Sequence, residues 1–333
     1  MRLLILGGTQ FLGRATAAAA LAAGHKVICA ARGLAGPVPD GATLIPVDRS
    51  APGGLAPLEG QRFDAVIDVA RVPSQIRSAL AELADRTGHW TFVSTCSVYA
   101  DQATPGQRVE TAPLLPAAPP GWDDPAASPE AYGRCKVAGE EAVRAAGVPA
   151  FICRAGLIVG PEDISDRFTY WPARLARGGP VLAPGTPADL VQCVDVRDLA
   201  SWLVGAAETG LTGTLDGMGV PLTRADFLAA VADGVGVTPE LVWVDQEFLA
   251  AQQVESWMGP HSLPLWLPLP EYAGFLSRDV TASLAAGLTC RHLSDTARDT
   301  LSWYTVTGVS NLKAGLTAAD EALVLEAWQN SHL

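Results

Sequence analysis

The sequence predicts an α/β fold, with a doubly wound parallel sheet followed by a smaller mixed lobe. The first half of the chain alternates apolar strand segments with helical segments, and its strands show no regular polar alternation. Strands of this kind are typical of a parallel sheet that helices cover on both faces. A glycine-rich turn at residues 7–13 follows the first strand directly. Right-handed crossovers then make a doubly wound sheet the simplest arrangement.

Each element of the first half follows from a short pattern. Strands are expected at residues 3–7, 26–31, 42–48, 64–70 and 90–95, with helices at 14–24 and 74–88. Residues 101–129 are rich in proline, alanine and glycine, so we expect a long surface excursion there. A helix then begins near Pro129 and Glu130 and ends near Gly147, because proline suits the first turn of a helix and glycine its end.

The second half is less regular. A buried strand is expected within residues 149–161, a strand and a helix within 191–208, and further helices near 224–235 and 314–328. The prolines of residues 263–270 argue against a helix and favour an ordered extended segment. We expect the first domain to comprise residues 1–155 plus 189–216, and the second lobe to comprise 156–188 plus 217–333.

Composition and charge restrict the class of protein. The 333 residues are 49% hydrophobic and 17% charged, which describes a folded globular protein. A net charge of −12 works against nucleic acid and anionic membranes as partners. The sequence has no apolar run of the roughly 18 residues that span a membrane. Its start is broken by glycine too early for a signal peptide, so a cytoplasmic location is expected. The scattered cysteines favour reduced thiols and no metal site.

The turn at residues 7–13 has the pattern of a dinucleotide-binding loop. Gly7, Gly8 and Gly13 lie between a strand and a helix, where the backbone can approach a pyrophosphate and the helix N-terminus supplies N–H donors. The position in a strand–helix–strand unit strengthens the pattern, although Gln10 stands where a middle glycine is usual. A tight structural turn is the alternative. We expect the cofactor to contact Gly7, Gly8, Thr9, Gln10, Phe11, Leu12 and Gly13.

The end of the second strand indicates which dinucleotide binds. The acidic residue that usually contacts the ribose 2′-hydroxyl is missing, and Arg32 stands just beyond the strand. A guanidinium there pairs with the 2′-phosphate of NADP, so NADP(H) is favoured over NAD(H). The alternative is that Arg32 is a solvated loop charge. Asp48 and Arg49 are expected beside the adenine, and Val69 and Ala70 along the cofactor.

Tyr132 and Lys136 are four residues apart on the helix expected after Pro129, so they share one of its faces. A phenol is a poor acid or base at neutral pH, since its reference pKa is about 10. A nearby ammonium group would lower the pKa of Tyr132 and let the phenol exchange a proton with a substrate oxygen. Lys136 can also hold the nicotinamide ribose. The alternative is an ordinary aromatic–aliphatic pair on a helix.

The glycine turn, the strand end "STCSVY" and the segment "YGRCK" occur in an order that resembles the short-chain dehydrogenase/reductase superfamily. The resemblance is to its extended branch, the NAD-dependent epimerase/dehydratase family, and covers nearly the whole chain. It implies a Rossmann-type domain in which Thr95 hydrogen-bonds the reacting oxygen, with Tyr132 and Lys136 as its catalytic partners. Ser97 is expected either to make a second substrate contact or only to cap the turn.

Departures from the family pattern narrow the range of expected substrates. Dehydratases of this branch carry an Asp-Glu pair where this chain has Cys96 and Ser97, so dehydration is disfavoured. Leu157 replaces the asparagine usual in nucleotide-sugar enzymes, and the loop at 184–196 lacks the usual arginine before its "V-x-D" strand. A small metabolite without a linked nucleotide is therefore expected. Candidate substrate contacts, with packing of the lobe as the alternative, are Trp122, Phe168, Tyr170 and Trp257.

The leading hypothesis is an NADP(H)-dependent reductase or dehydrogenase that interconverts a carbonyl and an alcohol on a small metabolite. An NAD(P)-dependent epimerase of a sugar or related substrate is the nearest alternative. A non-catalytic binding or regulatory protein with the same fold is the second. The expected partner is a small-molecule substrate, and the expected assembly is a monomer or a homodimer.

Overall fold

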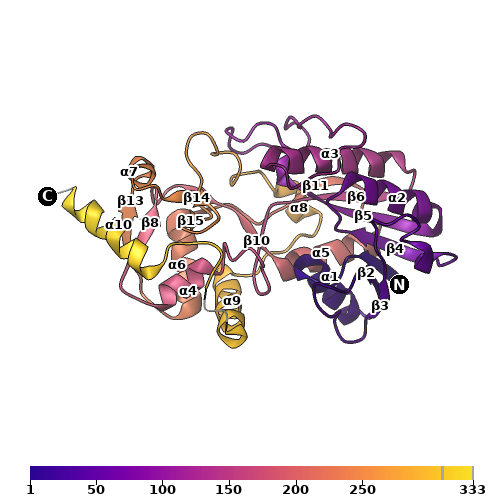
Figure 1. Cartoon of the computed structure of the whole chain (residues 1–333), viewed down its shortest axis with the longest axis horizontal. Helices are drawn as coiled ribbons and strands as arrows, with labels where there is room; N and C mark the ends of the chain where they lie inside the picture. Colours follow the sequence, from indigo (N-terminus) through magenta and orange to yellow (C-terminus); the bar gives the residue numbers. More distant parts are fainter. Residues whose placement is uncertain (309–310, 332–333) are drawn as a thin grey trace.

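The computed structural model describes residues 1–308 and 311–331 and has a central parallel sheet (Figure 1). The sheet order is β11-β6-β5-β4-β1-β2-β3. Its strands, in chain order, are β1 (Arg2–Leu6), β2 (Lys26–Ala31), β3 (Thr43–Pro46), β4 (Phe63–Asp68), β5 (Thr87–Thr95), β6 (Ala150–Ala155) and β11 (Gly213–Gly217). Since β2 and β4 lie on opposite sides of β1, the strand order reverses there, and such a switch point is where open α/β sheets bind ligands.

Helices cover both faces of this sheet. Along β1, Leu4 and Leu6 face a core shared with α2 (Pro73–Leu83) and α3 (Pro129–Ala145). Leu3 and Ile5 face the opposite core, shared with α1 (Phe11–Ala22) and α5 (Val196–Thr209). The apolar strands therefore bury both their faces, and the predicted doubly wound α/β class is confirmed.

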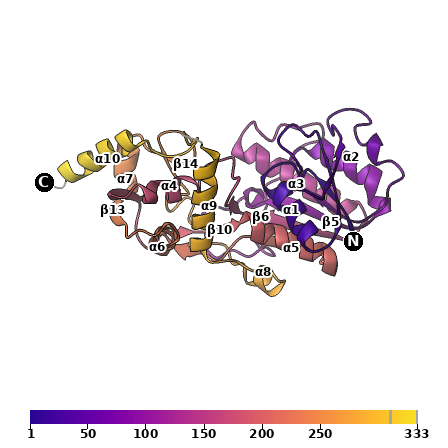
Figure 2. The same ribbon diagram turned by 90° about the horizontal axis from the view of Figure 1, so that it is seen from below.

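The second lobe is built from short strand pairs and helices, at the opposite end of the molecule from the N-terminus (Figure 2). The pairs outside the main sheet join β7 (Leu157–Val159) to β10 (Cys193–Asp195), β8 (Pro180–Pro184) to β13 (Glu240–Val244), β9 (Leu190–Val191) to β12 (Leu222–Thr223), and β14 (Glu255–Trp257) to β15 (Ser262–Pro264). Of these strands, β10 packs on the first domain, since its Val194 shares a core with Phe151 of β6 and Leu203 of α5. The later helices are α4 (Tyr170–Ala176), α6 (Arg224–Val235), α7 (Gln246–Ala251), α8 (Thr281–Ala285), α9 (Leu293–Thr307) and α10 (Ala318–Asn330). Short 3-10 turns lie at Ala56–Leu58, Ala84–Arg86 and Cys96–Val98.

Several boundaries differ from the sequence prediction for identifiable reasons. The strand expected within residues 149–161 divides at Gly156, because β6 pairs with β5 in the main sheet whereas β7 pairs with β10. The last helix starts at Ala318 rather than near 314, because the Thr317 hydroxyl accepts a hydrogen bond from the Asp320 N–H and caps it. The helix expected at 224–235 has those bounds.

The sequence prediction missed α9. Its buried face consists of Thr296, Ala297 and Thr300, which carry too little apolar surface to produce a helical hydrophobic pattern. The helix packs closely on α6 instead. A Cβ atom at Gly234 of α6 would lie 2.2 Å from the carbonyl oxygen of Ser294 of α9, so only glycine allows the two helices to come this close. Within the described ranges, no helix is long and apolar enough to cross a membrane.

Candidate active site

The glycine turn after β1 depends on all three of its glycines. Gly7 and Gly8 have φ values of +130° and +95°, which side-chain-bearing residues rarely adopt. A Cβ atom would lie 2.7 Å from Val69 Cγ2 at Gly7 and 2.5 Å from Cys29 Sγ at Gly8. At Gly13 it would lie 2.7 Å from the backbone nitrogen of Gly8. The turn, helix α1 and the end of β4 therefore pack as closely as the predicted cradle requires.

The N-terminus of α1 fits a pyrophosphate. Gln10 precedes the helix in an extended conformation, and its side chain makes no capping hydrogen bond to the first turn. The free N–H groups and the positive end of the helix dipole therefore remain available to an anion. Thr9 and Leu12 are buried beneath this surface, while Gln10 is exposed and Phe11 is partly exposed. These residues fit a dinucleotide such as NAD or NADP.

The two strand ends expected at the adenosine side behave differently. Arg32 is exposed beyond β2, and within the described residues its guanidinium has no hydrogen bond or ion pair. Arg49, in contrast, donates to both carboxylate oxygens of buried Asp68, at 2.8 and 3.0 Å, and to the Gln75 carbonyl oxygen at 2.8 Å. Asp48 is exposed. Arg32 is therefore available to a ligand, whereas the Arg49 guanidinium is already hydrogen-bonded to Asp68 and Gln75.

Lys136 is buried behind the carboxyl ends of β4 and β5. Its ammonium donates to the carbonyl oxygens of Ala70 and Val93, both at 2.6 Å, and the residue is 2% exposed. Burial lowers the pKa of Lys136 to about 7, while the carboxylate of Asp68 opposes this shift. The lysine thus links α3 to the strand ends that carry Val69, Ala70 and Thr95.

β5 ends at Thr95, whose side chain caps the following 3-10 turn. Thr95 Oγ1 accepts a hydrogen bond from the Ser97 N–H at 3.2 Å and donates to Ser97 Oγ at 3.3 Å. Thr95 is 7% exposed, and Ser97 is partly exposed. Burial raises the pKa of the neighbouring Cys96 thiol to about 12, so this thiol stays protonated at neutral pH.

Tyr132 lies beside this turn because α3 packs on it through a glycine. A Cβ atom at Gly133 would lie 2.1 Å from the Ser97 carbonyl oxygen, so a larger residue would displace the helix. The Tyr132 side chain interacts with that of Thr95, which brings together two of the three predicted catalytic residues. The expected lowering of the Tyr132 pKa is not found: burial raises it, and outweighs the Thr95 interaction and nearby positive charges.

Two arginines that the sequence prediction did not include in the site supply this positive charge. Arg71 follows the end of β4 and is exposed, and Arg167 comes from the second lobe. Both lower the pKa of Tyr132. The Arg167 guanidinium lies 4.8 Å from the Trp257 ring centroid, and its Nε donates to Ser165 Oγ at 3.1 Å. No spacing or motif in the sequence connects these arginines to the tyrosine.

Beneath the site, Glu140 is the centre of a buried polar network. It accepts from Ser94 Oγ at 2.6 Å and from Arg154 Nε and Nη2 at 2.9 and 2.8 Å. Arg144, which is nearer the surface, donates a hydrogen bond of 2.8 Å from Nη2 to the Glu140 carboxylate. Glu140 lies one helical turn after Lys136, a signal that could have identified it. The network fixes α3 against β5 and β6.

A second group of buried charges continues the network toward the later part of the chain. Tyr99 donates to Asp216 Oδ1 at 2.6 Å and accepts from Arg154 Nη1 at 3.2 Å. Arg278 donates to Asp216 Oδ2 at 2.9 Å, and its guanidinium lies 3.4 Å from the Tyr99 ring centroid. The segment containing Arg278 is thereby fixed to β11 of the main sheet.

The predicted aromatic substrate contacts lie in three different places. Phe168 and Tyr170 are 0% and 2% exposed in the core of the second lobe, so the structure does not bring their side chains to the site. Trp122 packs on the outer side of α3, with the Arg134 guanidinium 4.9 Å from its ring centroid. Trp257 is partly exposed and contacts Arg167, so it remains a candidate.

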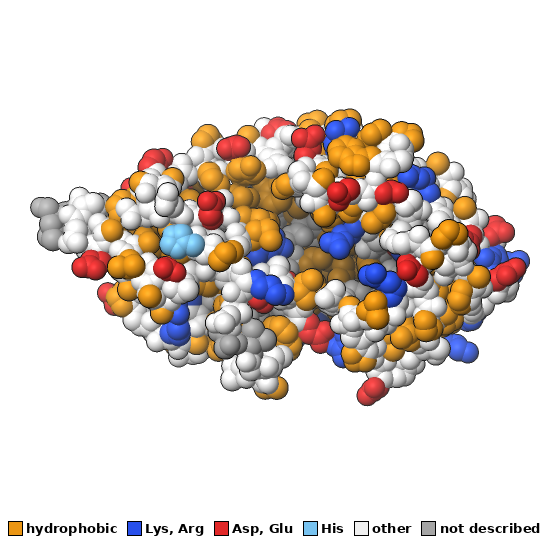
Figure 3. All heavy atoms as spheres, viewed as in Figure 1, with side chains coloured by type: hydrophobic (Ala, Val, Ile, Leu, Met, Phe, Trp, Pro, Cys, Tyr) orange, Lys and Arg blue, Asp and Glu red, His pale blue; other side chains and the backbone are white. Residues whose placement is uncertain are grey.

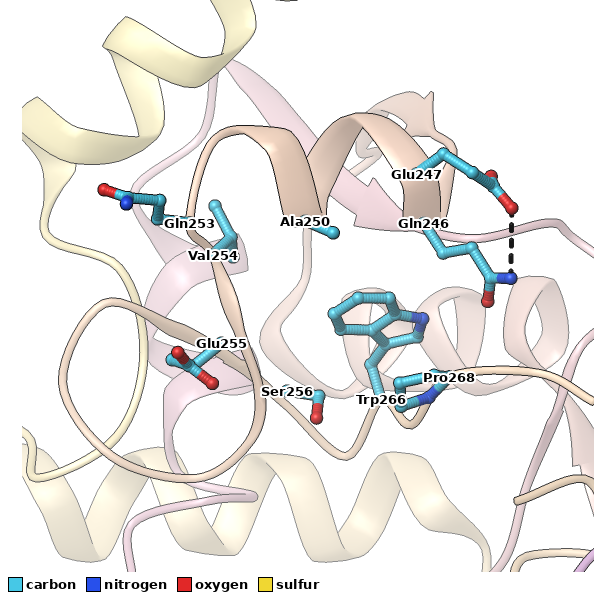
Figure 4. Close-up of a pocket in the computed structure, with 9 residues that line it drawn as sticks. All are labelled: Gln246, Glu247, Ala250, Gln253, Val254, Glu255, Ser256, Trp266 and Pro268. Carbon is cyan, nitrogen blue, oxygen red and sulfur yellow. Dashed lines mark hydrogen bonds between the residues drawn. The ribbon is translucent and has the colours of Figure 1, made fainter. Parts of the chain in front are cut away.

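The surface between the lobes is hollowed. Figure 3 shows hydrophobic side chains inside this hollow and Lys or Arg side chains around it. A separate cavity of about 420 Å³ lies in the second lobe between α7 and the segment around Trp266 and Pro268 (Figure 4). Its lining does not include Thr95, Tyr132 or Lys136. We therefore assign the chemistry to the strand ends and not to this cavity.

The fold defines the class of protein, one with a Rossmann-type α/β domain and a smaller second lobe. Residues 67–215 match the model of the NAD dependent epimerase/dehydratase family. The matched region contains Thr95, Tyr132 and Lys136, whereas the glycine turn precedes it. The predicted resemblance to this family is confirmed over residues 67–215, and the family's description agrees with a nicotinamide dinucleotide as the cofactor.

A curated protein, the ceramide reductase of Caulobacter vibrioides, is 29% identical to this chain over 186 residues. The match covers 53% of this chain and 58% of that relative. The chain therefore matches little more than half of the relative's length.

Solved structures resemble the chain over nearly its whole length. A putative epimerase from Burkholderia cenocepacia has a TM-score of 0.67 at 21% identity, covering 90% of this chain and 97% of its own. Bordetella bronchiseptica WbmG, in complex with NAD and UDP, has a TM-score of 0.66 at 18% identity, covering 96% and 99%. The UDP-glucose 4-epimerase of Thermus thermophilus, in complex with NAD, scores 0.63 at 20% identity, covering 92% and 99%. At these identities the likeness shows the fold.

Proposed function

We propose that this protein is an NADP(H)-dependent reductase that converts a carbonyl of a small metabolite to an alcohol. The observation that carries the proposal is the proximity of Thr95 and Tyr132 at the end of β5, with Lys136 buried behind them. The glycine turn would hold the cofactor pyrophosphate, Arg32 the 2′-phosphate and Lys136 the nicotinamide ribose. When bound, the cofactor supplies the hydride.

In this mechanism Tyr132 donates a proton to the substrate oxygen. The raised pKa of Tyr132 keeps the phenol protonated at neutral pH, which suits a proton donor and favours the reductive direction. Thr95 hydrogen-bonds the same oxygen and orients it. Arg71 and Arg167 stabilise negative charge that develops on the oxygen or on the phenolate after proton transfer. Each group acts by position and electrostatics on one substrate oxygen.

The choice of reductase over dehydratase has chemical support. With a pKa of about 12, the Cys96 thiol stays protonated at neutral pH and neither accepts nor readily releases a proton, so dehydration lacks its acid–base pair. The name of the curated relative, ceramide reductase, supports net reduction and adds lipid-derived ketones to the candidate substrates. Epimerisation is the second candidate, since solved structures with the same fold are named epimerases.

Cofactor stoichiometry tests the proposal. Purified protein is mixed with NADPH and a panel of aldehydes, small ketones and long-chain keto-lipids, and absorbance of the reduced cofactor is followed beside product formation. A reductase consumes one NADPH for each alcohol formed. Turnover of a sugar substrate without net change in cofactor would overturn the reductase in favour of the epimerase. Failure of every compound despite NADPH binding would reject the proposed substrate class.

A further inference from the structure

A second cavity, of about 200 Å³, lies beside the excursion at residues 101–129 and is mostly apolar. It is bordered by one residue of that excursion and by three segments of the later chain. Its lining residues are Pro105, Ala188, Asp189, Leu190, Arg224, Leu267, Leu269, Tyr272, Ala273 and Leu276. The excursion is held there by hydrogen bonds from the Gly106 N–H to the Ser277 carbonyl and from the Gly274 N–H to the Gln102 carbonyl, both at 2.8 Å. These two bonds hold the excursion against residues 274–277 on one side of the cavity.

Arg224 is the cationic group in these walls. It is 2% exposed, and Nη1 donates a hydrogen bond of 3.3 Å to the Leu265 carbonyl oxygen. Its Nε has no hydrogen-bond partner, and across the described residues the guanidinium forms no ion pair. The side chain therefore carries a buried donor without a partner and a charge without a counter-ion.

Asp189 is near enough to stabilise the charge of Arg224 but does not pair with it. Its carboxylate accepts from the Thr186 N–H at 2.8 Å and from Thr186 Oγ1 at 2.6 Å. Burial lowers the pKa of Arg224 to about 10, and Asp189 opposes this shift, so the guanidinium remains charged at neutral pH. A buried charge without a direct partner destabilises the folded state.

The backbone fixes the position of this guanidinium. The Arg224 N–H donates to the Asp189 carbonyl oxygen at 2.6 Å, and Thr223 caps α6 by accepting from the Asp226 N–H at 3.0 Å. The side chain therefore starts at the rigid first turn of α6. A planar guanidinium fixed in this way is preorganised to pair with a carboxylate.

We propose that this cavity is a binding site for a small monocarboxylate with an apolar body, whose carboxylate pairs with Arg224. The apolar walls bind the carbon chain, and the guanidinium gains the counter-ion that the protein does not supply. A phosphate fits less well, because a dianion meets only one cation here and is repelled twice as strongly by Asp189. The site is independent of the proposed reductase activity, and its ligand binds without any cofactor.

Calorimetric titration of the cofactor-free protein with hexanoate, octanoate and the alcohols hexan-1-ol and octan-1-ol tests the proposal. Each acid is expected to bind at least tenfold more tightly than the alcohol of equal chain length. Arg224→Gln is expected to reduce the affinity for the acid to that of the alcohol, and Arg224→Lys to lower it partly. Arg298→Gln, which changes an exposed arginine on α9, is the matched control and should leave binding unchanged.

Thermal unfolding separates this role from a purely structural one. If Arg224 is an unpaired cation, Arg224→Gln unfolds at the same or a higher temperature than wild type without ligand, and hexanoate raises the unfolding temperature of the wild type alone. Equal binding of acid and alcohol, no binding of either acid, or equal acid binding by wild type and Arg224→Gln would each overturn the proposal. If phosphate competes with hexanoate at equal concentration, the cavity binds anions in general, and the proposed preference for a monocarboxylate is rejected.

Discussion

The hydroxyl of Tyr132 is the atom on which the proposed chemistry depends. Tyr132→Phe keeps the ring and its packing beside the Thr95 turn but removes the proton that the substrate oxygen needs. We expect turnover to fall by about 10²–10⁴-fold, the usual contribution of general acid catalysis, while the dissociation constant for NADPH stays unchanged. Steady-state kinetics and calorimetric titration measure the two effects. Undiminished turnover of the phenylalanine variant would exclude Tyr132 as the proton donor.

Lys136 makes protein stability depend on pH in a defined direction. Its pKa is about 7 in the folded protein and near the ordinary lysine value of 10.5 when unfolded, so between these pH values the unfolded chain binds more protons. Stability from this group therefore rises from pH 7 to pH 10. Lys136→Met lacks this contribution, so the unfolding temperature of the variant minus that of wild type should decrease from pH 7 to pH 10.

Lys136→Met also loses the two hydrogen bonds from the lysine to the carbonyl oxygens of Ala70 and Val93. Because those carbonyls do not titrate, this loss shifts the difference in unfolding temperature between variant and wild type by the same amount at every pH. Thermal scans of both proteins at matched ionic strength provide the measurement. A difference that does not change with pH would mean that the buried lysine has an ordinary pKa.

The buried network at Glu140 determines how α3 sits on the sheet. Glu140→Gln removes a carboxylate that accepts from Arg154, Ser94 and Arg144, and it leaves the Arg154 charge buried without its partner. Breaking a buried pair in this way typically costs about 3–5 kcal/mol. Urea unfolding should show a loss of this size. Glu141→Gln, at the adjacent exposed position, is the matched control and should change stability by less than about 0.5 kcal/mol.

At the element scale, the sequence predicted what depends on local pattern and missed what depends on contacts distant in the chain. The glycine turn and the spacing of Tyr132 and Lys136 are local, and α3 begins at Pro129 as predicted. Arg167 reaches the site from the second lobe, so no spacing pointed to it. The helix α9 was missed because its packing relies on small residues and a facing glycine, not on an apolar stripe.

For the whole molecule, the sequence pattern predicts the main sheet but not the position of the substrate-binding residues. The main sheet could be predicted because its strands bury both faces and therefore have a continuous apolar pattern. Aromatic residues of the second lobe gave no such guide, since Phe168 and Trp257 are both large aromatic side chains, yet Phe168 lies in the core and Trp257 lies beside Arg167. The division of the chain into two domains stays a prediction.

Binding of NADPH is expected to stabilise the whole molecule. A ligand that binds only the folded state at 100 times its dissociation constant raises the free energy of unfolding by about 2.7 kcal/mol. Because the Arg32 guanidinium is unpaired within the described chain, it is available for the 2′-phosphate that distinguishes NADPH from NADH. Thermal scans should therefore show a larger upward shift with NADPH than with NADH at equal concentration.

Arg32→Ala should reduce the NADPH shift to the NADH value without changing the NADH shift, because only the contact to the 2′-phosphate is lost. Arg62→Ala, at an exposed arginine of the same domain, controls for the loss of one positive charge and should behave as wild type. If Arg32→Ala reduces the NADPH and NADH shifts in unfolding temperature equally, Arg32 contacts the ribose or supports the fold and does not recognise the 2′-phosphate. No shift with either cofactor would favour a non-catalytic role, because a reductase must bind a fresh cofactor in every turnover.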